Sequence, residues 1–234
     1  MTTPFARLVP EGGLVVSCQA PADSPFRDPA LMALMATAAA AGGAAAIRAN
    51  GPDDVAAIAG AVRLPIIGIY KLGDPDGVFI TPTVEAALAV IAAGAGIVAL
   101  DGTRRDRADG TTLASQIAGI RESSDAPIMA DVDTLEAGLR ARDAGADAIA
   151  TTLSGYTGHG PADGVDIELI AALAQELDCP IVAEGRIRTD ADVAAARAAG
   201  AHALVIGTAI TNPVATTRSF VAALARTRLA SAHG

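Results

Sequence analysis

One lysine stands among sixteen arginines in this chain of 234 residues, and it ends a short apolar run, PIIGIYK, that begins at Pro65. Because this chain uses arginine for almost all of its basic residues, the single lysine indicates a function that arginine cannot perform. Arginine stays protonated in proteins, whereas a lysine withdrawn from water can accept and return a proton. Lys71 is therefore a candidate general acid–base, or a nucleophile that forms a Schiff base. The alternative is a surface lysine placed by chance.

A carboxylate, Glu184, ends a second apolar run, PIVAEG, which begins at Pro180. A lysine and a carboxylate that face one substrate could remove a proton from a carbon next to a carbonyl group and return it. A helix cap or an ion pair at the rim is the alternative role for Glu184. Eight such runs close on a polar residue or a glycine, namely Gln19, Arg48, Lys71, Asp101, Asp131, Thr151, Glu184 and Gly207.

Two repeated patterns indicate the elements that position these residues. Alanine-rich helical segments end in glycine about every fifty residues, at Gly43, Gly96, Gly145 and Gly200, and a β-branched run follows each. Glycine is common just beyond a helix because it adopts the left-handed conformation without a Cβ clash. Apolar runs that begin at Pro65, Pro127 and Pro180 fall between these segments, and GLVVSCQ is a first member without proline.

The two patterns predict eight strands that alternate with eight helices. The strands are expected near residues 13–18, 44–48, 65–70, 96–100, 126–130, 147–151, 180–183 and 203–207. The helices are expected near residues 28–41, 52–62, 83–93, 111–122, 133–144, 166–178, 189–199 and 214–226. The strands are continuously apolar, as expected when both faces of a sheet are covered.

This alternation predicts an α/β protein with a (β/α)₈ TIM barrel, formed by one domain over residues 1–234. A doubly wound open sheet is the alternative, and the lack of a GxGxxG turn after the first strand disfavours it. In a barrel the polar strand ends share the carboxyl-terminal rim, where barrel enzymes hold their active sites. The third and seventh strands lie opposite each other, so Lys71 and Glu184 are expected to reach one substrate from two sides.

A phosphate site is expected at the turns after the seventh and eighth strands, EGRIRT and IGTAIT. Barrels that bind phosphate use these two loops and the start of a short extra helix. Gly185 and Gly207 let the backbone approach an anion closely, so that the amides of the turn that continues into Thr208 can face it. Arg186 either adds a charged contact or faces solvent.

Composition excludes several classes of function. The net charge is −9, aromatic residues make up 3% of the chain, and no basic run occurs, which argues against nucleic acids and anionic membranes as partners. No segment has the pattern of a membrane span or a signal peptide, so a cytoplasmic location is expected. Cys18 and Cys179 are expected to be buried thiols. No metal-ligand spacing and no nucleotide motif appears, so no metal or other cofactor is expected.

Motifs along nearly the whole chain resemble those of the N-acetylmannosamine-6-phosphate 2-epimerases. They are SCQA (17–20), AAIRANG (45–51), PIIGIYK (65–71), FITPT (79–83), ALDGTRR (99–105), MAD (129–131), TTLSGYT (151–157), AEGRI (183–187) and IGTAIT (206–211). The resemblance implies a barrel of the ribulose-phosphate-binding type. It also implies a cytoplasmic epimerase of sialic acid and amino sugar catabolism that needs no metal or nucleotide, acting on a phosphorylated N-acetylhexosamine. A homodimer is compatible with the sequence.

Carried over position by position, the resemblance implies that Lys71 is the catalytic lysine and Glu184 its partner. The substrate-binding residues that it implies are Gln19, Arg48, Asp131, Thr152 and Tyr156, and the phosphate-binding residues are Gly185, Arg186, Gly207 and Thr208. One position departs from the family, which often reads ITRP where this chain reads ITNP. Asn212 therefore stands where an arginine is expected, and the phosphate site is either weaker or supported by Arg186.

Two other functions remain open on the residues alone. One is a different sugar-phosphate barrel enzyme, such as an aldolase-type lyase that uses Lys71 as a Schiff base. Borohydride trapping with substrate separates this from an epimerase, which forms no imine. The other is a non-catalytic sugar-phosphate sensor, which a turnover assay excludes.

Overall fold

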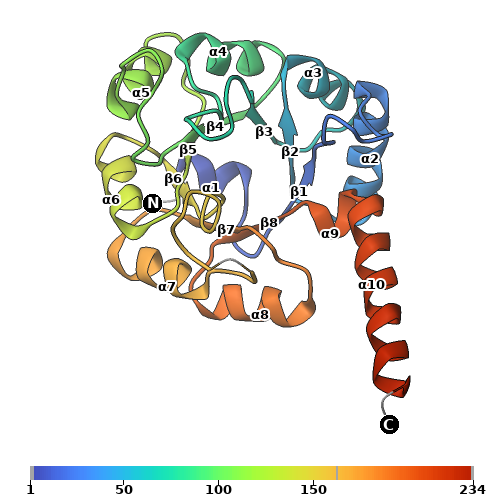
Figure 1. Ribbon diagram of the computed structural model, residues 1–234. Coiled ribbons are helices and arrows are strands. Elements are labelled where there is room, and N and C mark those ends of the chain that lie inside the picture. Colours follow the sequence, from blue (N-terminus) through green and yellow to red (C-terminus); the bar gives the residue numbers. More distant parts are fainter. Residues whose placement is uncertain (1–2, 162, 233–234) are drawn as a thin grey trace.

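Eight parallel strands close into a barrel, and each strand pairs with its neighbour in the sequence (Figure 1). This computed structural model describes residues 3–161 and 163–232. β8 pairs with β1, with Val15 opposite Val205, and this pairing closes the sheet. The strands are β1 (Leu14–Cys18), β2 (Ala46–Asn50), β3 (Ile66–Ile69), β4 (Ile97–Asp101), β5 (Ile128–Asp131), β6 (Ala148–Ala150), β7 (Ile181–Glu184) and β8 (Ala203–Ile206). The predicted (β/α)₈ barrel is confirmed.

Helices alternate with the strands, and several of them start where the sequence supplies a capping side chain. They are α2 (Pro29–Ala41), α3 (Pro52–Ala61), α4 (Val84–Ala92), α5 (Leu113–Arg121), α6 (Leu135–Asp143), α7 (Ile167–Glu176), α8 (Asp190–Ala198) and α10 (Pro213–Ala232). A threonine hydroxyl accepts a hydrogen bond from the first turn of α4, α5, α6 and α8, which satisfies an amide that has no partner within the helix.

Glycines end several helices as predicted, with one correction. Gly43, Gly145 and Gly200 have φ values of 94°, 104° and 100°. After α4 the left-handed residue is Gly94, with φ 114°, and not Gly96. Gly94 follows Ala93, the C-cap of α4, and donates to Ile91 O, which completes the last turn. Gly96 already donates to Ile66 O in the neighbouring strand, so it belongs to the approach to β4.

The core has two layers, as a barrel requires. Side chains that point inward from alternate strand positions fill the barrel interior, among them Val15, Ile67, Ile97, Met129 and Val205. Side chains that point outward pack against the surrounding helices, among them Ile47, Val98, Ile128, Ile149 and Leu204. Cys18 is fully buried in the outer layer, and burial raises the pKa of its thiol to about 12. Cys179 is half-buried, and burial raises its pKa to about 11.

A short helix that was not predicted, α1 (Pro4–Leu8), closes the amino-terminal end of the barrel (Figure 1). Thr3 caps it by accepting a hydrogen bond from the amide of Ala6, and Pro4 occupies its first position. Phe5 and Val9 are fully buried among the inward-pointing strand residues. The ring of His202 contacts Phe5 at a centroid distance of 6.3 Å. The floor of the barrel is therefore apolar, and its opposite end carries the polar residues.

The last helix, α10, leaves the barrel wall and extends away from it (Figure 1). The prediction of a helix over 214–226 is confirmed, but this helix packs mainly against the short α9 (Thr208–Thr211) and does not cover a strand as the other barrel helices do. Phe220, Val221 and Leu224 on it are 68%, 61% and 63% exposed. In the described part of the chain, no helix is both long enough and apolar enough to cross a membrane.

Candidate active site

A buried arginine holds two carboxylates together at the carboxyl-terminal mouth of the barrel. Arg48 in β2 is 1% exposed and Asp131, the last residue of β5, is fully buried. Nη2 of Arg48 donates to Oδ2 of Asp131 at 2.5 Å, and Nη1 donates to Oδ1 at 3.0 Å. Nη1 also donates to Oε2 of Glu184, at the end of β7, at 2.6 Å. A planar guanidinium fits this bidentate arrangement, and an ammonium does not.

Two threonines of the TTLSGYT motif complete this network. The hydroxyl of Thr152 donates to Oδ1 of Asp131 at 2.7 Å and lies 3.1 Å from Oε2 of Glu184, so it bridges the two carboxylates. The hydroxyl of Thr151 donates to the carbonyl of Glu184 at 2.9 Å and accepts from its amide at 3.1 Å. The backbone and the side chain of Glu184 are thus both fixed from β6.

The network changes the acidity of its members in opposite ways. Burial lowers the pKa of Arg48, but the charges of Asp131 and Glu184 outweigh burial, so the pKa is raised and Arg48 stays charged. For Glu184 burial is the largest effect and raises the pKa. Arg48 opposes this rise, Asp131 adds to it, and Thr152 and Lys71 oppose it. Glu184 is therefore a weaker acid than a free glutamate, which suits a group that gains and loses a proton.

Lys71 follows β3 at the same mouth, where its residue is exposed. Its amide donates to Oδ1 of Asn50, at the end of β2, at 2.9 Å. Withdrawal from solvent by the surrounding protein lowers the pKa of Lys71, and the charge of Arg48 lowers it further, while Glu184 and Asp131 oppose the change. Among the described residues no carboxylate forms an ion pair with Lys71. Its chemistry is that of an amine that deprotonates more readily than a surface lysine.

Gln19, just after β1, offers an acceptor to a ligand. Its Nε2 donates to the hydroxyl of Ser17 at 2.8 Å. Its Oε1 is buried and has no hydrogen-bond partner within the described residues, and the same is true of Nε of Arg48. Buried polar atoms in folded proteins are almost always paired, so an orphaned atom at a binding site indicates a contact that the ligand supplies.

In the turn after β7, the side chain of Arg186 neither extends toward a phosphate site nor simply faces solvent, the two roles considered from the sequence. Gly185 and Arg186 have φ values of 117° and 56°. The guanidinium of Arg186 donates to the carbonyls of Gly164 and Ser154 at 2.7 and 3.0 Å. It also lies 5.1 Å from the ring centroid of Tyr156, which is 64% exposed. The side chain of Arg186 therefore secures the loop between β6 and α7.

The turn after β8 leads directly into α9. Gly207 precedes this helix, and its carbonyl accepts from the amides of Ile210 and Thr211 at 2.9 and 2.8 Å. The amide of Thr208 comes before this first hydrogen-bonded turn and has no acceptor within the described residues, so it can face an anion. The hydroxyl of Thr211 donates to the carbonyl of Ser17 at 2.8 Å, which ties the turn to β1.

Asn212, which the sequence presents as the loss of a phosphate-binding arginine, has a structural role. Its Oδ1 accepts a hydrogen bond from the amide of Ala215 at 3.0 Å, so it caps the first turn of α10. Asparagine is among the best residues at this position. Asn50 and Ser17 also contribute to the site, and sequence reasoning gave them no role; Thr151, predicted only as a polar strand end, contributes as well. Sequence features could have identified these residues: the runs SCQ and AIRAN have polar ends, and Thr151 stands at a strand end.

Comparison with known proteins agrees with this geometry. A family model described as "Putative N-acetylmannosamine-6-phosphate epimerase" matches residues 32–226. A relative from Cutibacterium acnes is 53% identical over 216 residues, which are 91% of this chain and 94% of that protein. Its name is "Putative N-acetylmannosamine-6-phosphate 2-epimerase". A similarly named protein of Caldanaerobacter subterraneus is 47% identical over 90% of each chain.

Solved structures show the same likeness. The N-acetylmannosamine-6-phosphate 2-epimerase from Clostridium perfringens superposes with a TM-score of 0.88 at 38% identity, over 93% of this chain and 95% of that one. A thiamine phosphate pyrophosphorylase from Pyrococcus furiosus, 18% identical with a TM-score of 0.58 over 87% of this chain and 88% of that one, shares the fold alone. By the family model, the relatives and the superposed barrel, this chain belongs to the N-acetylmannosamine-6-phosphate 2-epimerase family.

Proposed function

We propose that this protein interconverts N-acetylmannosamine 6-phosphate and N-acetylglucosamine 6-phosphate by proton transfer at C2, in cytoplasmic amino sugar and sialic acid catabolism. The relatives' names supply the substrate. The observation that carries the proposal is the arrangement at the mouth, where a lysine with a lowered pKa shares its electrostatic surroundings with a buried carboxylate whose pKa is raised. These opposite shifts are typical of a base and an acid that serve one reaction.

In the proposed reaction, neutral Lys71 removes the proton from C2, which lies next to the C1 carbonyl of the open sugar. Negative charge then develops on an enolate-like oxygen and the acetamido region. In the proposal the fixed positive charge of Arg48 stabilises this negative charge, while Thr152, whose hydroxyl proton is donated to Asp131, can accept a hydrogen bond from the substrate. A proton returns on the opposite face and inverts the carbon. Either Glu184 supplies this proton, or it relays one to and from Lys71.

The remaining contacts of the proposal hold the substrate. The phosphate binds the turns after β7 and β8, through the backbone at Gly185, Arg186, Gly207 and Thr208. The orphaned Oε1 of Gln19 accepts a hydrogen bond from a sugar hydroxyl, and Tyr156 lies on the loop that borders the mouth. Asp131, which is fully buried, contributes to substrate binding by holding the guanidinium of Arg48 in place. The positive φ of Gly185 and the free amide at the start of α9 support the phosphate assignment. The reaction as proposed uses no metal and no nucleotide.

A homodimer is part of the proposal, and α10 supports it. The exposed apolar residues Phe220, Val221 and Leu224 lie on a helix that its own barrel leaves uncovered. A second copy of the chain is the partner that supplies an equivalent surface. Light scattering after size-exclusion chromatography should give a dimer for the natural chain and a smaller species for Leu224→Glu. A monomeric natural chain would refute this part of the proposal.

Turnover in D₂O tests the reaction. The enzyme should place deuterium at C2 of the product, because a lysine ammonium carries three equivalent protons that mix with solvent. Product without deuterium at C2 calls for a second run with C2-deuterated substrate in H₂O, in which retained label shows internal return of the proton. Exchange of the acetamido group or a carbon fragment with an added pool would show a cleavage route and overturn the proposal. Borohydride should trap no imine, whereas an aldolase would be trapped.

A further inference from the structure

The segment after Lys71 folds back on itself as a hairpin at the rim of the barrel. Lys71 pairs with Ile80 in an antiparallel bridge, and the amide of Leu72 donates to the carbonyl of Phe79 at 2.9 Å. The amide of Asp101, at the end of β4, donates to the carbonyl of Ile80 at 2.9 Å. The returning arm of the hairpin is therefore hydrogen-bonded to β4, and the position of the Lys71 backbone depends on this contact.

The base of the hairpin carries backbone strain. Thr81 is fully buried and has φ 49°, a conformation that is costly for a β-branched residue. Three hydrogen bonds hold it there. Its amide donates to the carbonyl of Tyr70 at 2.9 Å, its hydroxyl accepts from the amide of Tyr70 at 3.0 Å, and its carbonyl accepts from Nε2 of Gln116 at 2.8 Å. Strain of this kind persists where the surroundings fix a functional geometry.

The tip of the hairpin is held by one arginine from the loop after β4. Nη1 of Arg105 donates to the carbonyl of Pro75 at 3.2 Å, and its guanidinium lies 6.0 Å from the ring centroid of Phe79. Nη2 donates to Oδ2 of Asp101 at 2.7 Å. Asp101 is fully buried, and its Oδ1 accepts from the amide and the hydroxyl of Thr103 at 3.0 and 2.6 Å. Arg105 thus joins a rigid carboxylate of the barrel to the hairpin.

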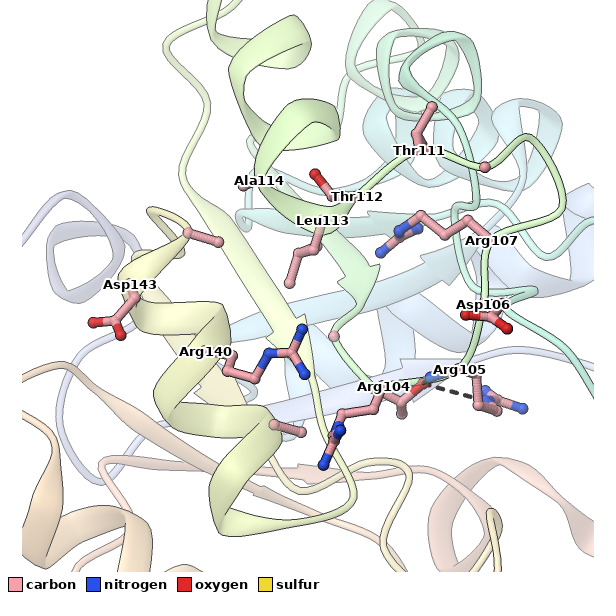
Figure 2. Close-up of a pocket in the computed structure, with 15 residues that line it drawn as sticks. Arg104, Arg105, Asp106, Arg107, Thr111, Thr112, Leu113, Ala114, Arg140 and Asp143 are labelled. Atoms are coloured by element: carbon pink, nitrogen blue, oxygen red, sulfur yellow. Dashed lines mark hydrogen bonds between the residues drawn. The ribbon is translucent and has the colours of Figure 1, made fainter.

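The neighbouring arginines of this loop have other partners. Nη1 of Arg104 donates to both carboxylate oxygens of Glu136 on α6 in an exposed ion pair, and Arg104 lines a pocket of about 540 Å³ between the loop and that helix. Figure 2 shows Arg104 and Arg105 leaving the loop in different directions. Arg107 is buried and donates to the carbonyls of Pro82 and Asp101 at 3.4 and 2.5 Å, which binds the end of the hairpin to β4.

We propose that Arg105 is a positioning residue for the reaction: fixed by Asp101, it holds the hairpin at Pro75, near the tip, and at Phe79, on the returning arm, and so sets the direction from which Lys71 approaches the substrate. Within the described residues, the hydrogen bonds of the Arg105 side chain go to Thr103, Pro75 and Asp101 and none goes to the Arg48 network, so its path to Lys71 is the hairpin. The proposal rests on the proposed function to the extent that Lys71 moves the C2 proton. Its physical content, the placement of Lys71, is measurable without substrate.

The single lysine of the chain makes that measurement direct. Reductive methylation with ¹³C-formaldehyde labels Lys71 and the amino terminus, and the spectrum of Lys71→Arg identifies the lysine signal. Titration of that signal by NMR gives the pKa of Lys71 in the natural chain, in Arg105→Gln and in the matched control Arg104→Gln. The charged groups that act on Lys71, which are Arg48, Asp131 and Glu184, are present in all three proteins.

In Arg105→Gln the pKa of Lys71 should rise toward about 10.4, its value in water, because the loosened hairpin no longer holds the amine close to the protein groups that lower its pKa. With the unmodified enzyme, kcat should fall by about 10- to 100-fold, the loss expected from a misplacement of about 1 Å, while KM changes little. Arg104→Gln should match the natural chain in both measurements. If Arg105→Gln does not fold, Asp101→Asn with Arg105→Gln removes both charges and leaves no buried carboxylate unpaired.

A folded Arg105 variant with an unchanged lysine titration and an unchanged kcat would overturn the inference. The same shift in Arg104→Gln would also overturn it, because the effect would then belong to the loop in general. Failure of the proposed function looks different. The natural chain would then show no turnover of N-acetylmannosamine 6-phosphate, while the NMR comparison of the variants would still report whether Arg105 positions Lys71.

Discussion

Replacement of Asp131 by asparagine tests how strongly the buried network contributes to stability. Asp131 and Arg48 are 0% and 1% exposed, and Asp131 accepts three hydrogen bonds, two from Arg48 and one from Thr152. Asparagine keeps one acceptor oxygen and turns an amide donor toward a guanidinium that also donates. Removal of one partner from a buried ion pair costs about 3–5 kcal/mol. Because Glu184 still balances Arg48 at 2.6 Å, we expect the lower end, about 3 kcal/mol.

Urea unfolding without substrate measures this loss. For a domain of this size about 3 kcal/mol corresponds to a fall in Tm of about 6–12 °C, and the denaturant slope should stay unchanged. Asp163→Asn is the matched control, because it breaks an ion pair with Arg188 in which Asp163 is 81% exposed. Exposed pairs contribute at most about 1 kcal/mol, so the control should unfold almost as the natural chain does.

An Arg48→Met background tests the cause of the loss. If the cost of Asp131→Asn comes from stranding the buried guanidinium, most of it should disappear once that guanidinium is absent. Equal costs in both backgrounds, or a loss below about 1 kcal/mol in the natural background, would refute the assignment of Asp131 as the main counter-charge of Arg48.

Four further predictions concern the reaction and the last helix. Lys71→Arg should keep the fold and lose at least about 10²–10⁴-fold in kcat, and near-normal turnover would exclude Lys71 as the base. Glu184→Gln should lower kcat with KM largely kept, and an unchanged kcat would leave it a structural role. kcat/KM should rise with pH as Lys71 loses its proton. Burial and then Arg48 lower the pKa of Lys71, so the rise should be centred below about 10.4, and a rise centred at or above that value would contradict the assignment. Asn212→Ala should lower the unfolding free energy by about 1 kcal/mol through loss of the α10 cap, with kcat unchanged; a large change in kcat would mean that this turn shapes the catalytic centre.

The order of the elements was predictable because each one is encoded locally. Runs such as IVAL in β4 are apolar throughout, and the threonines before α4 and α6 mark the helix starts. What failed depends on tertiary context. Whether Gly94 or Gly96 becomes left-handed depends on where the last turn of α4 ends, to within two residues. The course of α10 depends on which surface covers its apolar residues, and no local pattern encodes that.

The site was predictable as a set of rim residues, but its partnerships were not. Barrel topology brings Lys71 and Glu184 to one mouth, and reasoning from topology alone set them opposite each other. In the structure Glu184 pairs with Arg48, because a fully buried guanidinium needs counter-charges. Likewise Arg186 has the sequence position of a phosphate ligand, yet its guanidinium reaches two carbonyls of the β6–α7 loop. Side-chain reach of this kind depends on loop conformation, which spacing does not determine.

Helix α1, which closes the amino-terminal end of the barrel, affects the kinetics of proton exchange. Phe5 and Val9 fill the amino-terminal end with apolar side chains, so protons and water reach Lys71 from the mouth. A bound sugar phosphate covers that same opening. Loss of an abstracted proton to bulk water therefore competes with the next chemical step and with product departure. The fraction of product that carries solvent deuterium should then grow when added viscogen slows product departure. This fraction therefore reports the time for which the bound sugar phosphate covers the mouth.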